Sequence, residues 1–185
     1  MPTSTPTAAL GEALLASFRH NFQQYKALAD GALAQISPEE WLRRPAPGSN
    51  SVAVIVQHLV GNLRSRFTHF LTSDGEKPTR QRDQEFAEPV SAAGIPALQA
   101  EWAAAWRILF ALLDELRADD LLRTVHIRGE AHTVLQAVQR QVAHYCAHVG
   151  QLVQLAKIIR GEDFASLSIP RGQSQQFNQR MTEGR

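Results

Sequence analysis

The sequence predicts an all-α protein, an antiparallel four-helix bundle with a long loop after its second helix. Two observations carry this prediction: apolar residues recur every three to five positions through four long segments, and turn or helix-start signals separate those segments. Short connections elsewhere favour antiparallel neighbours. A chain of 185 residues suffices for one sizeable core, so residues 1–185 are expected to form a single domain.

The first expected helix covers residues 8–36 and is amphipathic. Its apolar face comprises Leu10, Leu14, Phe18, Phe22, Tyr25, Leu28 and Leu33. The motif "SPEEW" at residues 37–41 predicts one short helical turn after it. Ser37 can cap such a turn, Pro38 suits its first position, and Glu40 can bond back to the cap.

The second helix is expected over residues 51–71, with Asn50 or Ser51 as its cap. Residues 72–94 form a long, charge-rich loop, and loops of this length in a compact domain are often functional. The third helix is expected over residues 96–117, because it begins at a proline, which suits the first helical position.

The segment "TVHIRGEAHTV" at residues 124–134 has β-branched residues on both sides of an "RGEA" turn. It predicts either a small hairpin or extended chain before the fourth helix. That helix is expected over residues 133–161, since a glycine commonly follows a helix C-terminus. Residues 1–7 and about 170–185 are expected to be peripheral or flexible, with the polar tail lying across the bundle surface.

The composition excludes some classes of protein. Hydrophobic residues make up 44% of the chain, charged residues 20%, and the formal net charge is +1, which argues against a large nucleic-acid interface. The single cysteine, Cys146, cannot form an internal disulfide, so a reducing, cytoplasmic location is expected. No signal-peptide pattern and no membrane-length apolar run is present, so no membrane partner is expected.

A histidine pair stands out in the fourth expected helix. His144 and His148 lie four residues apart and therefore project from the same side. On a helical wheel both fall at one edge of the apolar face, and Gln151 extends that edge. Cys146 falls roughly 160° around the helix from His148, so it cannot share an ion with the pair.

The second expected helix carries a matching edge, formed by His58, Asn62 and His69. If the two edges face each other, His58, His144 and His148 converge, and three imidazoles would leave one or two coordination positions for water. Imidazole ligands suit Zn, Ni, Fe or Mn. The alternative interpretation is that these histidines lie at the edge of the core and bond to their neighbours.

Three further residues are candidates for the site, each with a structural alternative. Asn62 could orient a ligand histidine or simply pack, and Gln151 could contact a metal-bound water or join two helices. Arg82 could bind an anionic substrate. The favoured alternative for Arg82 is a salt-bridged loop that latches onto the bundle. The charged residues of that loop cluster are Arg80, Arg82, Asp83 and Glu85.

The remaining histidines and tryptophans are expected to have structural roles. Surface or hydrogen-bonded positions are expected for His20, His69, His126 and His132. Glu130 is expected to close the turn. Trp102 and Trp106, four residues apart, are expected to anchor the core or a dimer interface.

Two motifs carry a resemblance to a known group of proteins. The segments "NSVAVIVQHLVGNL" and "HYCAHVGQLVQLAK" resemble the DinB/YfiT-like superfamily of four-helix-bundle proteins, whose pattern is one histidine in the second helix and H-x-x-x-H-x-G-Q in the last. Here these residues are His58, His144, His148, Gly150 and Gln151. The segments "FLTSDGEKPTRQRDQEF", "TVHIRGEAHTVLQA" and "SLSIPRG" are similar to a subfamily of unknown function within that group.

The resemblance implies a divalent metal held by His58, His144 and His148. It also implies a homodimer and a small-molecule substrate, because superfamily members include metal-dependent transferases and isomerases that use low-molecular-weight thiols such as bacillithiol or mycothiol. The leading expectation is therefore a thiol-dependent S-transferase. A metal-dependent hydrolase, or a non-catalytic metal-binding or stress-response helical module, is the alternative.

Overall fold

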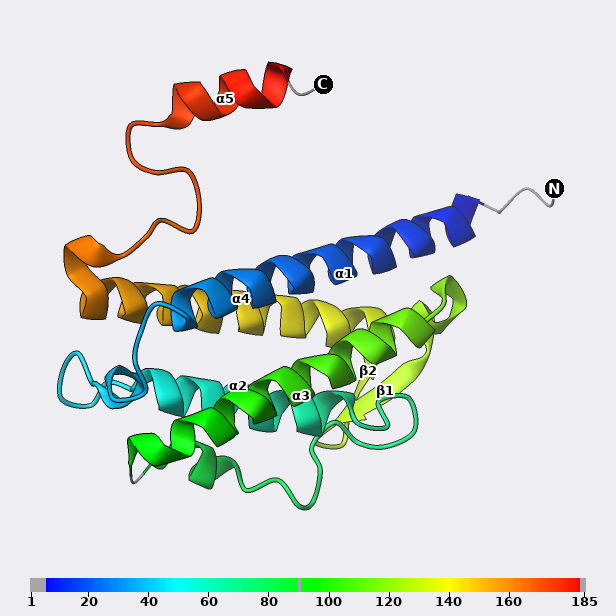
Figure 1. Ribbon diagram of the computed structural model, residues 1–185. Coiled ribbons are helices and arrows are strands. Elements are labelled where there is room, and N and C mark those ends of the chain that lie inside the picture. Colours follow the sequence, from blue (N-terminus) through cyan, green and yellow to red (C-terminus); the bar gives the residue numbers. More distant parts are fainter. Residues whose placement is uncertain (1–5, 90, 184–185) are drawn as a thin grey trace.

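The computed structural model describes residues 6–89 and 91–183 of the chain. It is mostly helical, in agreement with the all-α prediction, and four long helices lie side by side (Figure 1). The helices are α1 (Pro6–Leu33), α2 (Val52–Phe67), α3 (Ile95–Glu115), α4 (Val134–Arg160) and α5 (Ser174–Glu183). The single sheet within the described residues is a hairpin of β1 (Thr124–Ile127) and β2 (Glu130–Thr133), so the hairpin interpretation of this segment is confirmed.

The directions of the helices differ from the antiparallel arrangement that the sequence predicted. In Figure 1, α1 and α4 run one way, and α2 and α3 run the other. The contacts agree, because Gln35 after α1 bonds the backbone of Ala165 after α4, whereas Trp102 early in α3 bonds Asp30 late in α1. The long connection over residues 68–94 carries the chain back to the end of the molecule where α2 begins, so α3 can repeat its direction.

Helix α2 is shorter than predicted, and local backbone chemistry explains both of its ends. Ser51 caps the start, where its Oγ accepts the N–H of Val54 at 3.2 Å. The helix ends at Phe67 rather than Leu71, since the backbone of Thr68 is extended, with ψ 124°, and His69 follows in the left-handed region with φ 51°. Nearly every residue between these ends is buried, so α2 lies in the interior with neighbours on most sides.

Helix α4 begins with a reciprocal cap. Thr133 Oγ1 accepts the N–H of Gln136 at 3.1 Å, and the Gln136 side chain accepts the Thr133 N–H at 2.9 Å. The turn at residues 37–41 is built in the same way, because the Glu40 carboxylate accepts the Ser37 N–H at 2.7 Å. The cap at Thr133 fixes the register of the helix that carries the histidine pair.

Aromatic rings fill the centre of the core between the helices. Tyr145 of α4 is fully buried and contacts Phe22 of α1, Phe67 of α2 and Trp106 of α3, with ring centroids 5.6–6.4 Å apart. Trp102 packs edge-on against Trp106 at 5.4 Å, and both are buried. The two tryptophans therefore lie in the core of the single chain, and this part of their prediction is confirmed.

The loop over residues 72–94 is fixed to α2 and to the hairpin by hydrogen bonds. Ser65 Oγ donates to the carbonyl of Gly75 at 2.8 Å, and Gln57 donates to the carbonyl of Ala87 at 2.8 Å. Asp74 accepts the backbone N–H groups of Arg128 and Gly129 in the hairpin turn at 2.8 and 2.7 Å. These bonds hold the loop in one position along α2.

Helix α5 was not predicted, and all of its residues are exposed. In Figure 1 it lies apart from α1 and α4, so the expectation of a tail lying across the bundle surface is wrong for this helix. Among the described helices, none combines the length and the apolar character needed to cross a membrane.

Candidate metal centre

The three histidines singled out in the sequence come together between α2 and α4. One ring nitrogen from each of His58, His144 and His148 lies within 4.8 Å of the other two. The Nε2 atoms of His58 and His144 are 3.2 Å apart, and the ring centroids of His144 and His148 are 4.6 Å apart. His58 is buried and the other two are half-buried, so the cluster lies at the edge of the core, as its wheel positions indicated.

The outer nitrogens of two rings are anchored away from the cluster. His58 Nδ1 lies 2.9 Å from Glu85 Oε2, and His148 Nδ1 lies 2.9 Å from Gln151 Oε1. Both partners are acceptors, so each Nδ1 carries a proton and each Nε2 is left as the nitrogen that can ligate an ion. A hydrogen-bonded outer nitrogen is the usual arrangement around histidines that bind metals, because it fixes the ring and its tautomer.

The cluster is suited to a cation because burial disfavours the charged form of two of its rings, His144 and His148. Burial is the main cause that lowers the pKa of His144, to about 3, and the neighbouring His148 and His58 lower it further. Burial likewise lowers the pKa of His148. The Nε2 atoms of His58 and His144 share a hydrogen bond at 3.2 Å when one of them carries a proton, and both can instead ligate an ion, so the donor set fits a divalent metal.

Glu85 is held rigidly behind His58 by Arg80. The guanidinium makes a two-pronged contact, with Arg80 Nε 2.7 Å from Glu85 Oε1 and Arg80 Nη2 2.8 Å from Glu85 Oε2. The two side chains are only 4% and 9% exposed. Burial alone would raise the pKa of Glu85, but the hydrogen bonds from Arg80 and His58 outweigh it and lower the pKa. Glu85 is therefore a carboxylate.

A glycine makes room for this carboxylate. Gly61 lies one turn after His58 on α2, and a Cβ placed there would come within 2.1 Å of Glu85 Oε1 and 2.6 Å of its Cδ. No side chain larger than hydrogen fits while Glu85 holds its position. Gly61 thus allows the loop to reach His58 across the surface of the helix.

Further ion pairs connect this unit to the hairpin. Glu76 accepts from Arg66 at 2.8 Å and from Arg128 at 3.2 Å, and it lies 3.4 Å from Arg80. The chain of contacts runs from His58 through Glu85, Arg80 and Glu76 to the hairpin turn. The salt-bridged latch favoured for the loop is present, and it ends on His58 of the histidine cluster.

Residues 9–173 match the model of a family described as protein of unknown function (DUF1572). The chain belongs to the DUF1572 family. No curated protein and no solved structure is significantly similar to it. All residues of the histidine cluster and its anchors lie within the DUF1572 region, whereas α5 lies outside it.

For two of the other sequence candidates in this DUF1572 chain, the contacts agree with the structural alternative rather than with a direct role in the site. Asn62 Oδ1 accepts the hydroxyl of buried Tyr145 at 2.9 Å, which places it in core packing rather than beside a ligand histidine. Arg82 is exposed, and its guanidinium lies 5.1 Å above the ring of Phe86, which stacks on His58 at 4.9 Å. Arg82 is thus connected to the cluster through an aromatic ring.

The remaining predicted residues lie outside the cluster. Cys146 is exposed and is not part of the group of three, as its wheel position required. His20, His69 and His126 are exposed, and His132 is half-buried 3.6 Å from Glu130. His126 and His132 lie on opposite faces of the hairpin, because His126 pairs with Ala131 and His132 with Val125.

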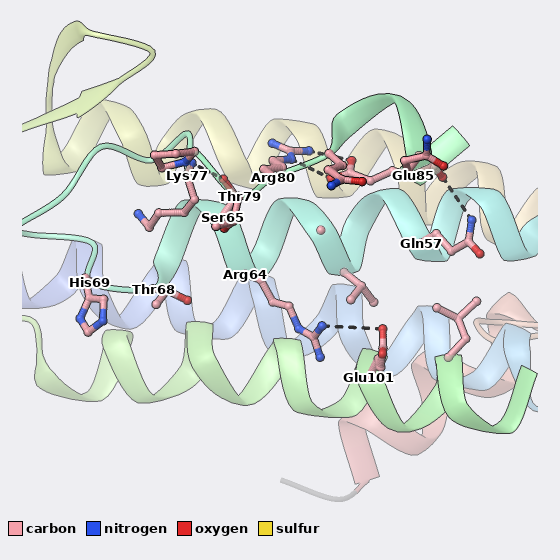
Figure 2. A pocket seen from close by; sticks show the side chains of 16 residues that line it. Gln57, Arg64, Ser65, Thr68, His69, Lys77, Thr79, Arg80, Glu85 and Glu101 are labelled. Carbon is pink, nitrogen blue, oxygen red and sulfur yellow. Dashed lines mark hydrogen bonds and ion pairs between the residues drawn. The ribbon is translucent and has the colours of Figure 1, made fainter. Parts of the chain in front are cut away.

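Two cavities are lined by the residues that anchor the cluster, one by Glu85 and the other by Gln151. The first, of about 660 Å³, lies between α2, α3 and the loop, and Figure 2 shows the Arg80–Glu85 pair on its wall and the Arg64–Glu101 pair across it. The second, of about 600 Å³, lies between residues 45–50, the start of α2 and the second half of α4, and Gln151 lines it. The anchors of His58 and His148 therefore each face a cavity.

Sequence reasoning missed the roles of Glu85 and Gly61. Glu85 was grouped with the loop charges, which follow no periodicity that would reveal its partner. Gly61 gave a usable signal, because an isolated glycine within a helical pattern commonly marks close packing, and it lies one turn from His58.

Proposed function

We propose that this chain is a divalent-metal-dependent enzyme in which His58, His144 and His148 hold the ion, within a DinB/YfiT-like four-helix bundle. One observation carries the proposal: three ring nitrogens meet within 4.8 Å while Glu85 and Gln151 anchor the outer nitrogens of two of the rings. The anchored Nδ1 atoms leave the Nε2 atoms of His58 and His148 available as metal ligands.

Three protein ligands leave a coordination position free, which is typical of catalytic rather than structural sites. A bound Zn, Ni, Fe or Mn ion would lower the pKa of a thiol or of water at that position. The chain's own residues orient two of the rings, since Nδ1 of His58 donates to Glu85 and Nδ1 of His148 donates to Gln151. Burial disfavours the charged form of His144 and His148.

The proposed reaction is the transfer of a low-molecular-weight thiol to an electrophilic substrate. The sulfur forms a bond to carbon, the leaving group departs with its electron pair, and the thiol proton passes to solvent. The similarity of "NSVAVIVQHLVGNL" and "HYCAHVGQLVQLAK" to a superfamily with thiol-using transferases supports this reaction over hydrolysis.

Metal analysis of the purified chain tests the proposal, with His144→Ala as the site variant and His20→Ala as its control. His20 is exposed on α1 and is not part of the cluster. We expect about one divalent ion per chain in the wild type and in the control, and a large loss in His144→Ala. Thiol conjugation should stop on chelation. Full thiol-conjugation activity in a chain from which chelation has removed all metal would contradict the proposal.

A further inference from the structure

The cavity of about 600 Å³ next to Gln151 has the position and size of a small-molecule pocket. Its walls come from three parts of the chain: residues 45–50, the start of α2, and the second half of α4. Ile55 lies on the α2 wall, three residues before His58, and Gly150 and Gln151 lie on the α4 wall, just after His148. The cavity thus begins one helical turn from two histidines of the cluster.

Gln151 joins the cavity to the metal centre directly. Its side chain lines the cavity, and its Oε1 accepts the Nδ1 proton of His148 at 2.9 Å. A molecule in the cavity therefore contacts the amide that orients a proposed metal ligand. The 660 Å³ cavity has no such contact with His148, since it lies against the Glu85 side of His58.

The lining of the cavity beside Gln151 defines the chemistry of its occupant. None of the lining residues in the described chain is charged, and Ser49, Asn50, Gln151 and Gln154 supply hydroxyl and amide groups beside apolar side chains such as Ile55. A charged group placed there would lose hydration without gaining a counter-charge. The 660 Å³ cavity is different, because Arg64, Lys77, Arg80, Glu85 and Glu101 line it.

Gly150 leaves this cavity open. It lies within α4, and a Cβ placed there would meet nothing within 4 Å. Glycine is the poorest helix former after proline, so a larger residue would favour the helix and would occupy the space that the glycine leaves. The position therefore offers a substitution that fills the cavity without disturbing the core.

We infer that the cavity beside Gln151 binds the uncharged, hydrogen-bonding part of the substrate of the proposed enzyme. The reaction of the bound molecule rests on the proposed function, whereas the binding of an uncharged molecule in the cavity does not. The electrophile enters next to His148, and its amide, nitro or hydroxyl groups meet the side-chain amides and hydroxyls of the wall. Substrates that carry a carboxylate or an ammonium group at this end are excluded.

A pair of isosteric probes tests the inference on the zinc-loaded chain: 3,5-dinitrobenzamide and 3,5-dinitrobenzoate, which differ by the charge of one group. Titration calorimetry should show that the amide binds at least about tenfold more tightly than the carboxylate. Gly150→Leu should weaken amide binding by at least about tenfold while zinc content and melting temperature are kept. Gly94→Leu is the control, since Gly94 also faces open space but lies at the start of α3.

Equal affinity for the two probes, no binding of the amide, or wild-type binding in Gly150→Leu would overturn the inference. Zinc content, measured on the same samples, separates it from the proposed function. A chain that binds zinc but not the amide contradicts only the cavity assignment. A chain that binds the amide in a Gly150-dependent way but binds no metal supports the cavity and contradicts the metal-dependent reaction.

Discussion

Nδ1 of His58 lies 2.9 Å from Oε2 of Glu85, although the two residues belong to a helix and to a loop 27 positions further along the chain. The carboxylate is nearly buried and is held by both prongs of Arg80. A buried carboxylate with two such partners has little freedom to turn away. The orientation of the His58 ring is therefore set by the loop as well as by α2.

Replacing Glu85 with glutamine should weaken zinc binding by about 10- to 100-fold, because an amide cannot accept from both Arg80 and His58 as the carboxylate does. Competition with a chromophoric chelator measures the change. Glu101→Gln is the matched control, since Glu101 lines the same cavity but is half-exposed and lies 3.7 Å from Arg64. Equal zinc affinity in both variants would show that Glu85 has no positioning role.

Gly61→Ala should reduce zinc affinity without touching any histidine. The added methyl would lie 2.1 Å from Glu85 Oε1, so the carboxylate must withdraw from His58. Gly150→Ala is the control, because its Cβ meets open space and it should gain about 0.5–1 kcal/mol of helix stability. Urea unfolding and zinc competition on both variants give the comparison. Zinc binding by Gly61→Ala equal to that of the control would contradict the packing argument.

Replacing Arg80 with methionine should lower the free energy of unfolding far more than replacing Arg82 with methionine. Arg80 is 4% exposed between Glu76 and Glu85, and its loss removes both guanidinium contacts from the nearly buried carboxylate of Glu85, which should cost about 3–5 kcal/mol of unfolding free energy. Arg82 is exposed, so its replacement should stay within about 0.5 kcal/mol. Urea denaturation measures both, and similar losses would contradict the assigned burial of Arg80 in the latch.

Acid should loosen the loop and the hairpin through Asp74. Backbone N–H groups of Glu76, Gly129 and Arg128 lower the pKa of Asp74 to about 2, from an ordinary value of 3.8. A lowered pKa means that the stabilisation is present above pH 3.8 and is lost as the pH falls toward 2.

Asp74→Asn should therefore be less stable than the wild type by about 1–2 kcal/mol at neutral pH, a value reduced for the partial exposure of the site. The difference between the two proteins should shrink as the pH falls through this window. Unfolding curves from pH 6 to about pH 2 test the prediction. A constant difference across the range would show that the charge of Asp74 does not stabilise the turn.

The helices, whose apolar residues recur at a regular period, could be predicted from the sequence, and so could the histidine cluster. Four amphipathic segments gave the long helices, and the wheel positions of His58, His144 and His148 on matching edges predicted that the three would meet. The cap at Ser51 and the turn after Ser37 followed from local backbone chemistry.

The remainder depends on contacts between distant residues. The predicted helix directions were wrong because the length of the segment over residues 68–94 does not reveal at which end of the bundle the next helix begins. Helix α5 was missed because its residues bury nothing, so no apolar stripe marks it. Glu85 reaches His58 only because Arg80 and Gly61 position it, and no local pattern encodes such a three-part contact.

X-ray absorption spectroscopy of the zinc-loaded chain tests the central claim most directly, because it counts the imidazoles on the ion. The account predicts three imidazole nitrogens at about 2.0–2.1 Å together with one or two water oxygens, and the loss of this signature in His144→Ala. A sulfur scatterer at about 2.3 Å, which only Cys146 or a methionine could supply, or fewer than three imidazoles, would contradict it.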